Sequence, residues 1–253
     1  MKRCLCMLAA MFILAGCATP KNFDLNDVVI TPVDGQIVSK YVPGNGSLEM
    51  QEAFAINDQE SPRGTIHVDY SVIDDGSGLL WTVTFASSDT IPITANVRSD
   101  KRGNIDSLEL SPKELLRSKN TPQGEKTVAM AKDLFHYVFM PLLDADATKT
   151  NAISERPPLS VSLDDINLNK SAKAVVSGMT TYNGIQCYVV KYHGEGTITV
   201  PSTREVLQNV REVFLLINKD TMMPVVGESR NVTQINRNTL KTVTNISRLK
   251  LVS

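Results

Sequence analysis

The stretch Ile66-His67-Val68-Asp69-Tyr70-Ser71-Val72 alternates apolar and polar side chains at every second residue. Successive side chains of a β-strand point to opposite faces of its sheet, so this alternation predicts a strand with one face in the core. The polar run Asp74-Asp75-Gly76-Ser77-Gly78 follows, and the alternation resumes from Leu79 to Phe85. Two such runs separated by a short polar loop predict a β-hairpin, and this hairpin sets the fold class.

The strand pattern continues on the C-terminal side of the hairpin. Alternating residues over 91–97 predict a third strand, and Lys101-Arg102-Gly103-Asn104 predicts a turn into a fourth at 105–110. The simplest arrangement of the four is an antiparallel meander.

From Ala174 onward the sequence again predicts strands and turns. Asn183-Gly184 separates apolar runs at 175–181 and 185–192, which is a strong signal for a two-residue hairpin. His193-Gly194-Glu195-Gly196 predicts a further turn, because glycine is common where the chain reverses.

Two features of the last 50 residues predict where their strands lie. The continuous apolar run Val213-Phe214-Leu215-Leu216-Ile217 predicts a strand buried on both faces. The segments 225–235 and 240–251 are rich in Thr, Asn and Arg, and we expect them to pair near a sheet edge.

One long helix is predicted between the two groups of strands. Apolar residues recur at helical spacing over 123–143, including Phe135 and Phe139. Ser111-Pro112-Lys113-Glu114 matches a capping box and predicts a short helix before it. The polar residues 144–158 divide the chain either between two halves of one domain or between two domains.

The N-terminus carries the pattern of an exported protein. Lys2 and Arg3 precede an apolar run over 5–15, which is too short to cross a bilayer and matches the apolar region of a signal peptide. The next residues, Leu14-Ala15-Gly16-Cys17, resemble the lipobox of bacterial lipoproteins at all four positions. The alternative is an ordinary secretory signal followed by a chance cysteine.

The lipoprotein resemblance implies cleavage after Gly16 and attachment of diacylglycerol and a fatty acid such as palmitate to Cys17. Ala18, rather than Asp, after the lipidated residue implies export to the outer membrane. We therefore expect a signal peptide at 1–16, a lipidated tether at 17–60 rich in Pro and Gly, and a β-rich periplasmic domain at 61–253.

Charge and cysteine content narrow the function classes. Loss of Lys2 and Arg3 leaves 24 basic and 27 acidic residues, a net charge of −3, without a basic cluster. This argues against nucleic-acid binding and leaves the lipid as the expected membrane attachment. Cys187 is the only cysteine expected in the folded part, which excludes an internal disulfide there. We expect it to be a small buried residue, with a reactive thiol as the alternative.

No catalytic, metal or cofactor motif is present. No second His or Cys stands at metal-binding spacing from His67, His136 or His193. The least implausible functional pair is His193 with Glu195, and its simpler interpretation is an exposed turn. Gly76-Ser77-Gly78 resembles the end of a serine-hydrolase elbow without its strand-to-helix context, and phosphate-binding and dinucleotide-binding loops are absent. The acidic pairs Asp74-Asp75 and Asp164-Asp165 fall at predicted turns. We expect a non-catalytic protein without cofactor or metal.

The second half resembles the late strands of lipoprotein-localisation domains of the LolA/LolB type. The resemblance rests on 184–190, 213–218 and Met223-Pro224-Val225, and it carries over no ligand-binding residue. It implies a curved antiparallel half-barrel that closes around helices and holds acyl chains. With it, the predicted fold is α+β: a mostly antiparallel, curved sheet or half-barrel packed against the principal helix at 123–143.

Two functions are compatible with these observations. The first is a lipid-anchored, non-catalytic envelope protein that binds or scaffolds another envelope protein. The second is a carrier or sensor of a hydrophobic ligand such as a lipid or acyl chain. The second predicts an apolar cavity lined by residues such as Trp81, Phe135 and Phe139, which could equally be core residues.

Overall fold

The structure, a computed structural model, describes residues 28–33, 37, 40–88, 92–111, 135, 139, 153–163, 166–200, 205–236 and 241–252. These residues form eleven β-strands in one sheet. The strands are β1 (Gly44–Ile56), β2 (Gln59–Asp74), β3 (Leu79–Ser87), β4 (Ile93–Ser99), β5 (Ile105–Ser111), β6 (Ile153–Leu163), β7 (Ile166–Tyr182), β8 (Ile185–Val200), β9 (Glu205–Asn218), β10 (Pro224–Asn236) and β11 (Lys241–Val252).

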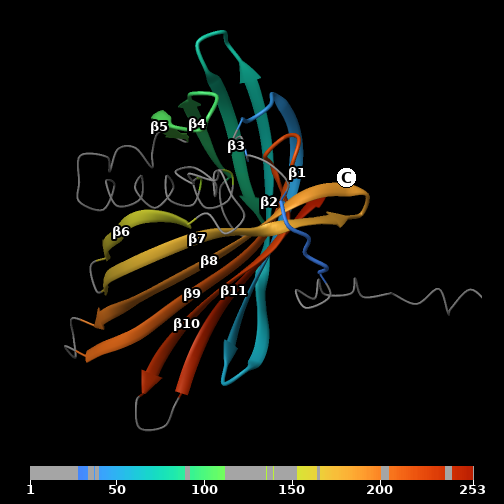
Figure 1. The fold of residues 1–253 in the computed structure, drawn as a ribbon. Coiled ribbons are helices and arrows are strands. Elements are labelled where there is room, and N and C mark those ends of the chain that lie inside the picture. The colour runs from blue at the N-terminus through green and yellow to red at the C-terminus, as the bar shows by residue number, and fades with distance from the viewer. Residues whose placement is uncertain are drawn as a thin grey trace, which may run out of the picture.

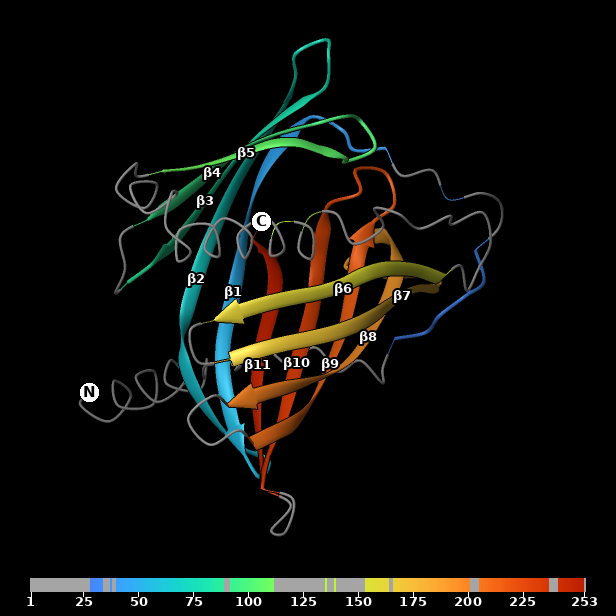
Figure 2. The ribbon, with the colours of Figure 1, turned by 90° about the vertical axis from the view of Figure 1, so that its left-hand side faces the viewer.

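The strand order is β5-β4-β3-β2-β1-β11-β10-β9-β8-β7-β6, with every pair antiparallel. Neighbours in the sheet are therefore neighbours in sequence, except where β1 pairs with β11 from Ser47↔Val252 to Ile56↔Val243. This pairing joins the two halves of the chain in the middle of the sheet. Figures 1 and 2 show that the sheet is strongly curved, with β5 and β6 on opposite sides of the concave face.

Several sequence predictions are confirmed. The hairpin over 66–85 is the β2–β3 pair, and β4 and β5 complete the predicted meander. Asn183 and Gly184 turn the chain between β7 and β8 with positive φ values of 48° and 80°, as a two-residue hairpin turn of this type requires.

The predicted α+β class is wrong. The described elements are all antiparallel strands, and no helical element stands beside them. Within 123–143 the structure describes Phe135 and Phe139 alone, both with helical backbone, and the rest of that range lies outside the described residues, as does the predicted short helix after Ser111. The class differs because strands run through ranges where glycine, proline and polar residues had predicted turns and a tether.

Three of these ranges show the cause. The first strand begins at Gly44, inside the range 17–60 predicted to be a tether. This range forms a strand because Leu48 and Met50 are buried in the core. The turn predicted at His193-Gly194-Glu195-Gly196 lies within β8, where the two glycines take positions of a regular ladder. The pair β10–β11 lies at the centre of the sheet rather than near an edge, and its polar residues occupy the faces.

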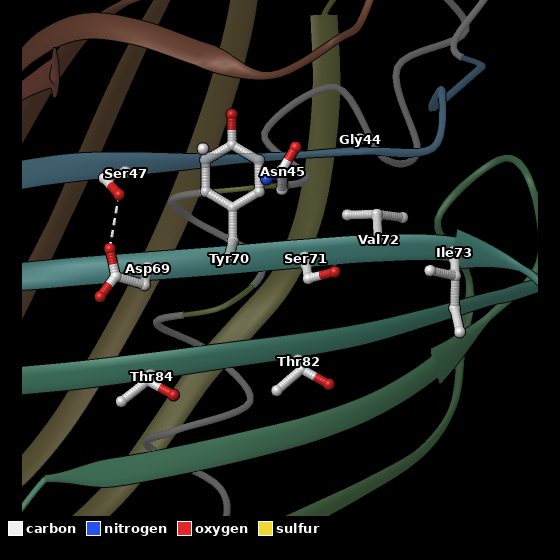
Figure 3. A pocket seen from close by; sticks show the side chains of 11 residues that line it. Gly44, Asn45, Ser47, Asp69, Tyr70, Ser71, Val72, Ile73, Thr82 and Thr84 are labelled. Atoms are coloured by element: carbon white, nitrogen blue, oxygen red, sulfur yellow. Dashed lines mark hydrogen bonds between the residues drawn. The ribbon is translucent and has the colours of Figure 1, made fainter. Parts of the chain in front are cut away.

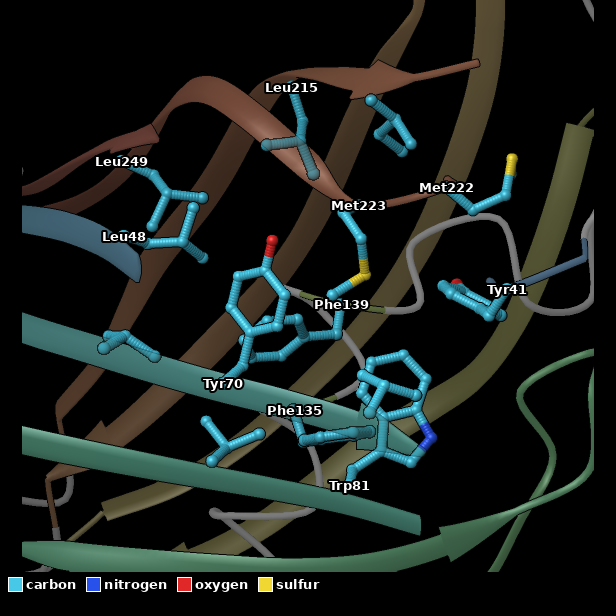
Figure 4. Packing of buried hydrophobic residues seen from close by; sticks show 14 of the residues in the cluster. Tyr41, Leu48, Tyr70, Trp81, Phe135, Phe139, Leu215, Met222, Met223 and Leu249 are labelled. Carbon is cyan, nitrogen blue, oxygen red and sulfur yellow. The ribbon is translucent and has the colours of Figure 1, made fainter. Parts of the chain in front are cut away.

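Aromatic rings fill the concave face at one end. Trp81 contacts Tyr41, Phe135 and Phe139 with ring centroids 5.3, 5.4 and 6.1 Å away, and Phe139 also lies 5.6 Å from the ring of Tyr70. Figure 4 shows these rings together with Leu48, Leu215 and Leu249 from strands of both halves and with Met222 and Met223 from the β9–β10 connection. The core therefore spans the β1–β11 pairing and ties the two halves together.

The convex face of β8–β10 carries a second apolar cluster. Phe214 and Leu216 face this side while Leu215 and Ile217 face the concave core, so the prediction of burial on both faces is confirmed. Cys187 is fully buried in the second cluster, and burial raises the pKa of its thiol to about 11, which makes it unreactive.

Residues 28–33, which we name the strap, cover the second cluster. Val28 and Ile30 pack against it, and the backbone of Thr31 exchanges two 2.8 Å hydrogen bonds with Met179 of β7. Gly178 permits this contact, because a Cβ atom there would lie 2.3 Å from the carbonyl oxygen of Thr31. The N-terminal segment is thus fastened to the edge of β7, beyond the end of its pairing with β6 at Val175.

The two outer strands carry features that oppose pairing with another sheet. β5 presents Asp106 and Glu109, and β6 contains Pro157 and Pro158, where its register with β7 shifts. Charges, prolines and irregularities on edge strands are common protections against edge-to-edge association. Within the described part of the chain, no helix is long and apolar enough to cross a membrane.

Candidate functional site

A surface hollow of about 580 Å³ lies over β1, β2 and β3, and we name it the β1–β3 hollow. Figure 3 shows the residues that line it. Strand alternation explains its polar part, because Asp69 and Ser71 of β2 alternate with Val68, Tyr70 and Val72, which belong to the concave core. The lining consists of Gly44, Asn45, Gly46, Ser47, Asp69, Tyr70, Ser71, Val72, Ile73, Thr82 and Thr84.

The lining is rich in hydroxyl groups and holds one carboxylate. Ser47 and Asp69 are direct cross-strand neighbours, and the Ser47 hydroxyl donates a hydrogen bond to Oδ1 of Asp69. Thr84 shares a 3.1 Å hydrogen bond with Thr94 on β4, while Ser71 opposite Thr82 is exposed. The hollow therefore offers donors and acceptors around a single negative charge.

Gly46 shapes the end of the hollow nearest β11. The Tyr70 ring crosses over Gly46, and a Cβ atom at position 46 would lie 2.5 Å from the Tyr70 hydroxyl oxygen. Any larger residue at position 46 would displace this ring from the core, where it contacts Phe139. Burial also raises the pKa of Tyr70, so its hydroxyl stays protonated at neutral pH and can donate a hydrogen bond.

The described pairing of β1 changes along its length. β11 ends at Val252, opposite Ser47, so Gly44–Gly46 pair with β2 and have no strand on their other side among the described residues. Asn57 N–H donates to the Thr242 carbonyl on the β11 side, and the β1–β11 register runs without a shift.

The direction of the Asn45 backbone follows from this register. Successive residues of an antiparallel strand direct their N–H and C=O groups alternately to its two neighbours. Because Asn57 faces β11, the other odd-numbered residues of β1 face it too. The N–H and C=O of Asn45 therefore point into the space beyond Val252, and Asn45 is exposed.

This arrangement offers hydrogen-bond donors and acceptors to a bound molecule. The hollow contains no cysteine, histidine or lysine, and its only carboxylate is already bonded to Ser47. The described residues also contain no group of three His, Cys, Asp or Glu side chains placed to hold a metal ion.

The structure brings three of the candidate residues from the sequence together and leaves others apart. Trp81, Phe135 and Phe139 meet in the core, where each is at most 1% exposed and each contacts the other two rings. They fill the place where a ligand cavity was expected between them. Gly16, Cys17 and Ala18 lie outside the described residues, as do His136 and the pair Asp164-Asp165.

The remaining polar candidates are accounted for by local contacts. Nε2 of His193 lies 3.0 Å from Oε1 of Glu195, with both side chains exposed on the convex face. Asp74 is paired with Lys101 at 2.6 Å and Asp75 with Arg98 at 2.8 Å, in the β2–β3 turn. The Lys101 hydrogen bond holds the pKa of Asp74 below its usual range. His67 lies on the convex face beside Glu49.

Sequence reasoning did not identify the hollow. Asn45 and Ser47 fall in or beside Val42-Pro43-Gly44-Asn45-Gly46, which predicts a turn rather than a strand. The polar alternation of Asp69 and Ser71 was visible, but which residues lie opposite them depends on the β1–β2 register. A signal was available in Ser47-Leu48-Glu49-Met50, which alternates as a strand should.

No protein-family model and no curated protein matches the sequence. Solved structures with some likeness include an exported protein with a YmcC-like fold from Bacteroides fragilis, 11% identical with a TM-score of 0.34 over 85% of this chain and 100% of that chain. The hypothetical lipoprotein YmcC from Escherichia coli is 17% identical, with a TM-score of 0.29 over 82% of this chain and 85% of that one. A LolA superfamily protein from Nitrosomonas europaea is 9% identical, with a TM-score of 0.15 over 85% and 89% of the two chains. These low values do not establish a family.

Proposed function

We propose that this chain is an envelope lipoprotein, anchored by lipidated Cys17 to the periplasmic side of the outer membrane, that binds another envelope component at the β1–β3 hollow without catalysing a reaction. The anchor is inferred from the lipobox Leu14-Ala15-Gly16-Cys17 and the charged and apolar residues before it. The binding site is inferred from the hollow.

The observation that carries the binding proposal is the exposed, hydrogen-bonding lining of the hollow. At its aromatic end, the concave face is filled by the protein's own rings. The strap packs against the convex face of β8–β10. The edge strands carry charged residues in β5 and prolines in β6. Among the described residues, the outer face of β1–β3 thus offers a hollow with exposed hydrogen-bonding groups.

The anchor is tested by growing cells with an alkyne fatty acid. We expect the wild-type protein to be labelled and Cys17→Ser to remain unlabelled. Label that persists in Cys17→Ser would contradict lipidation at this residue. Membrane fractionation of the labelled protein then tests its assignment to the outer membrane.

The binding site is tested by placing a photo-crosslinking amino acid at Ser71 of the full chain in intact cells. We expect a discrete crosslinked product from Ser71 and none from the same probe at Glu212, an exposed position on β9. Equal products from both positions, or none from Ser71, would contradict binding at the hollow. Lipid that co-purifies with the wild-type protein and is lost in Phe139→Ala would instead support a carrier.

A further inference from the structure

We propose that one end of the sheet faces the phospholipid headgroups of the membrane that holds the anchor. This end consists of the β7–β8 turn with its flanking residues, 182–186, and the β9–β10 connection, 219–223, and we name it the turn end. The inference rests on the proposed lipidation of Cys17 and adds an orientation on the membrane to it.

The strap leaves the sheet at the turn end. Thr31 forms an antiparallel bridge with Met179 through two backbone hydrogen bonds of 2.8 Å. Because antiparallel chains run in opposite directions, the strap residues before Thr31 lie beside the residues of β7 after Met179. Val28 and Tyr182 accordingly pack against the same apolar cluster. Figure 1 shows the strap beside the β7–β8 hairpin. The chain that leads back to the anchor therefore departs from the turn end.

The two parts of the turn end form one polar surface. The backbone N–H of Lys219 donates a 2.9 Å hydrogen bond to the carbonyl oxygen of Gln186, which joins the β9–β10 connection to the start of β8. The exposed residues here include Asn183, Gln186, Lys219 and Asp220. Polar side chains lose hydration without compensation among acyl chains, whereas headgroups offer them hydrogen-bond partners. The turn end therefore suits contact with headgroups rather than insertion.

The length of the tether excludes the inverted orientation. Eleven Cα–Cα steps separate Cys17 from Val28 (28 − 17). An extended chain covers at most about 3.3–3.6 Å per residue, so Val28 lies within about 40 Å of the anchor. β7 has 17 residues from Ile166 to Tyr182, and a strand of this length spans about 50 Å. With the Ile166 end against the bilayer and the strand upright, Val28 would lie beyond the reach of the tether.

The strap is what keeps the tether this short. If the strap left β7, the next described residue of the N-terminal segment that is buried in the core would be Ile37, which is 6% exposed. Twenty Cα–Cα steps separate Cys17 from Ile37 (37 − 17), and they extend to about 70 Å. This reach exceeds the length of β7, so either end of the sheet could then face the bilayer. Attachment of the strap thus sets the orientation.

Energy transfer to the bilayer tests the proposal. The full-length, mature, lipidated protein is reconstituted into vesicles of phosphatidylethanolamine and phosphatidylglycerol that contain rhodamine-labelled lipid. A donor fluorophore is attached through Lys219→Cys at the turn end or through Gln208→Cys, an exposed position toward the other end of β9. Cys187 is fully buried and should stay unlabelled. We expect transfer to be at least twofold more efficient from position 219 than from position 208.

Release of the strap tests the cause of the orientation. Gly178→Ala would place a Cβ atom 2.3 Å from the carbonyl oxygen of Thr31 and should remove most of the difference between positions 219 and 208. Gly64→Ala, where a Cβ atom meets nothing within 4 Å, is the matched control and should keep the difference. A Gly-Ser segment of about 20 residues inserted between Thr19 and Pro20 covers the case in which Gly178→Ala fails to fold. It lengthens the tether by up to about 70 Å with the strap in place, and the same loss is expected.

The outcomes separate this inference from the anchor itself. Equal transfer from the two positions, or more efficient transfer from position 208, would overturn the proposed orientation while the alkyne label on Cys17 keeps the anchor. A difference that persists in full in the insertion variant would also overturn it, because the orientation would then not depend on the length of the tether. Absence of the alkyne label from the wild type would remove the anchor and this inference together.

Discussion

The indole N–H of Trp81 donates a 2.9 Å hydrogen bond to Oγ of Ser99, and both residues are at most 1% exposed. The Ser99 hydroxyl in turn donates to the carbonyl oxygen of Asp100. A buried indole without a partner loses its hydration and gains nothing in return. This pair therefore fixes the orientation of the ring around which the concave core is packed.

Replacing Ser99 by alanine should destabilise the fold by about 1–3 kcal/mol, because the Trp81 N–H would be left buried without an acceptor. Urea unfolding followed by tryptophan fluorescence measures this change, since the chain has a single tryptophan. Ser107→Ala, at an exposed position of β5, is the control and should change the stability by less than about 0.5 kcal/mol. Equal stability of the two variants would contradict the role of the bond.

Phe139→Ala should destabilise the fold by about 3–5 kcal/mol, as expected for a large buried aromatic residue. Phe139 is fully buried and contacts Tyr70, Trp81 and Phe135. Ile73→Ala serves as a comparison, because Ile73 is 55% exposed and should contribute little. Unchanged unfolding of Phe139→Ala would indicate that the ring lines a ligand site rather than the core.

Gly178→Ala should detach the strap from β7. The added Cβ atom would meet the carbonyl oxygen of Thr31, and the φ of +151° is itself unfavourable for alanine by about 1–3 kcal/mol. We expect faster hydrogen exchange at the amides of Thr31 and Met179, measured by NMR. Gly64→Ala, where a Cβ atom meets nothing within 4 Å, should leave both amides protected.

Arg248→Met should make the stability less sensitive to acid. Arg248 bonds the carboxylate of Glu60 and lies 2.8 Å from Oε2 of Glu228, which is also paired with Arg230. The hydrogen bond from Arg248 is the largest cause that holds the pKa of Glu60 below its ordinary value of 4.5.

The sign of the pH effect follows from this depressed pKa. A carboxylate with a lower pKa in the folded state stabilises the protein above its unfolded pKa, and this stabilisation is lost as the pH falls through the folded value. The wild type should therefore lose more stability between pH 6 and about 3 than Arg248→Met. Arg102→Met, at an exposed turn, should keep the wild-type slope in denaturant titrations at each pH.

Local sequence patterns predicted the local pairings and missed the long-range one. The alternation from Ile66 to Phe85 and the turn at Asn183-Gly184 each involve neighbouring segments, so their geometry follows from a few residues. The pairing of Ser47 with Val252 brings together residues that are 205 positions apart in sequence (252 − 47), and no local pattern encodes it. The surroundings of the hollow depend on this pairing, because it places β11 beside Ser47.

The helix predicted at 123–143 led to the wrong fold class, α+β, for a related reason. Apolar residues at helical spacing over 123–143 indicated a packing layer, but the part that the structure describes contributes two phenylalanine rings to a core built by the sheet. Likewise, the glycines and prolines of 17–60 concealed β1, whose Leu48 is fully buried. Composition predicted a tether where tertiary packing supports a strand.

The central β1–β11 pairing has a consequence for biogenesis. β11 follows the other described strands in sequence, so β1 gains its second neighbour only after β6–β10 have been synthesised. Contacts of such large sequence separation also form slowly, because a long loop must close first. The order of the strands thus makes the central pairing a late step, on which the joining of the two halves depends.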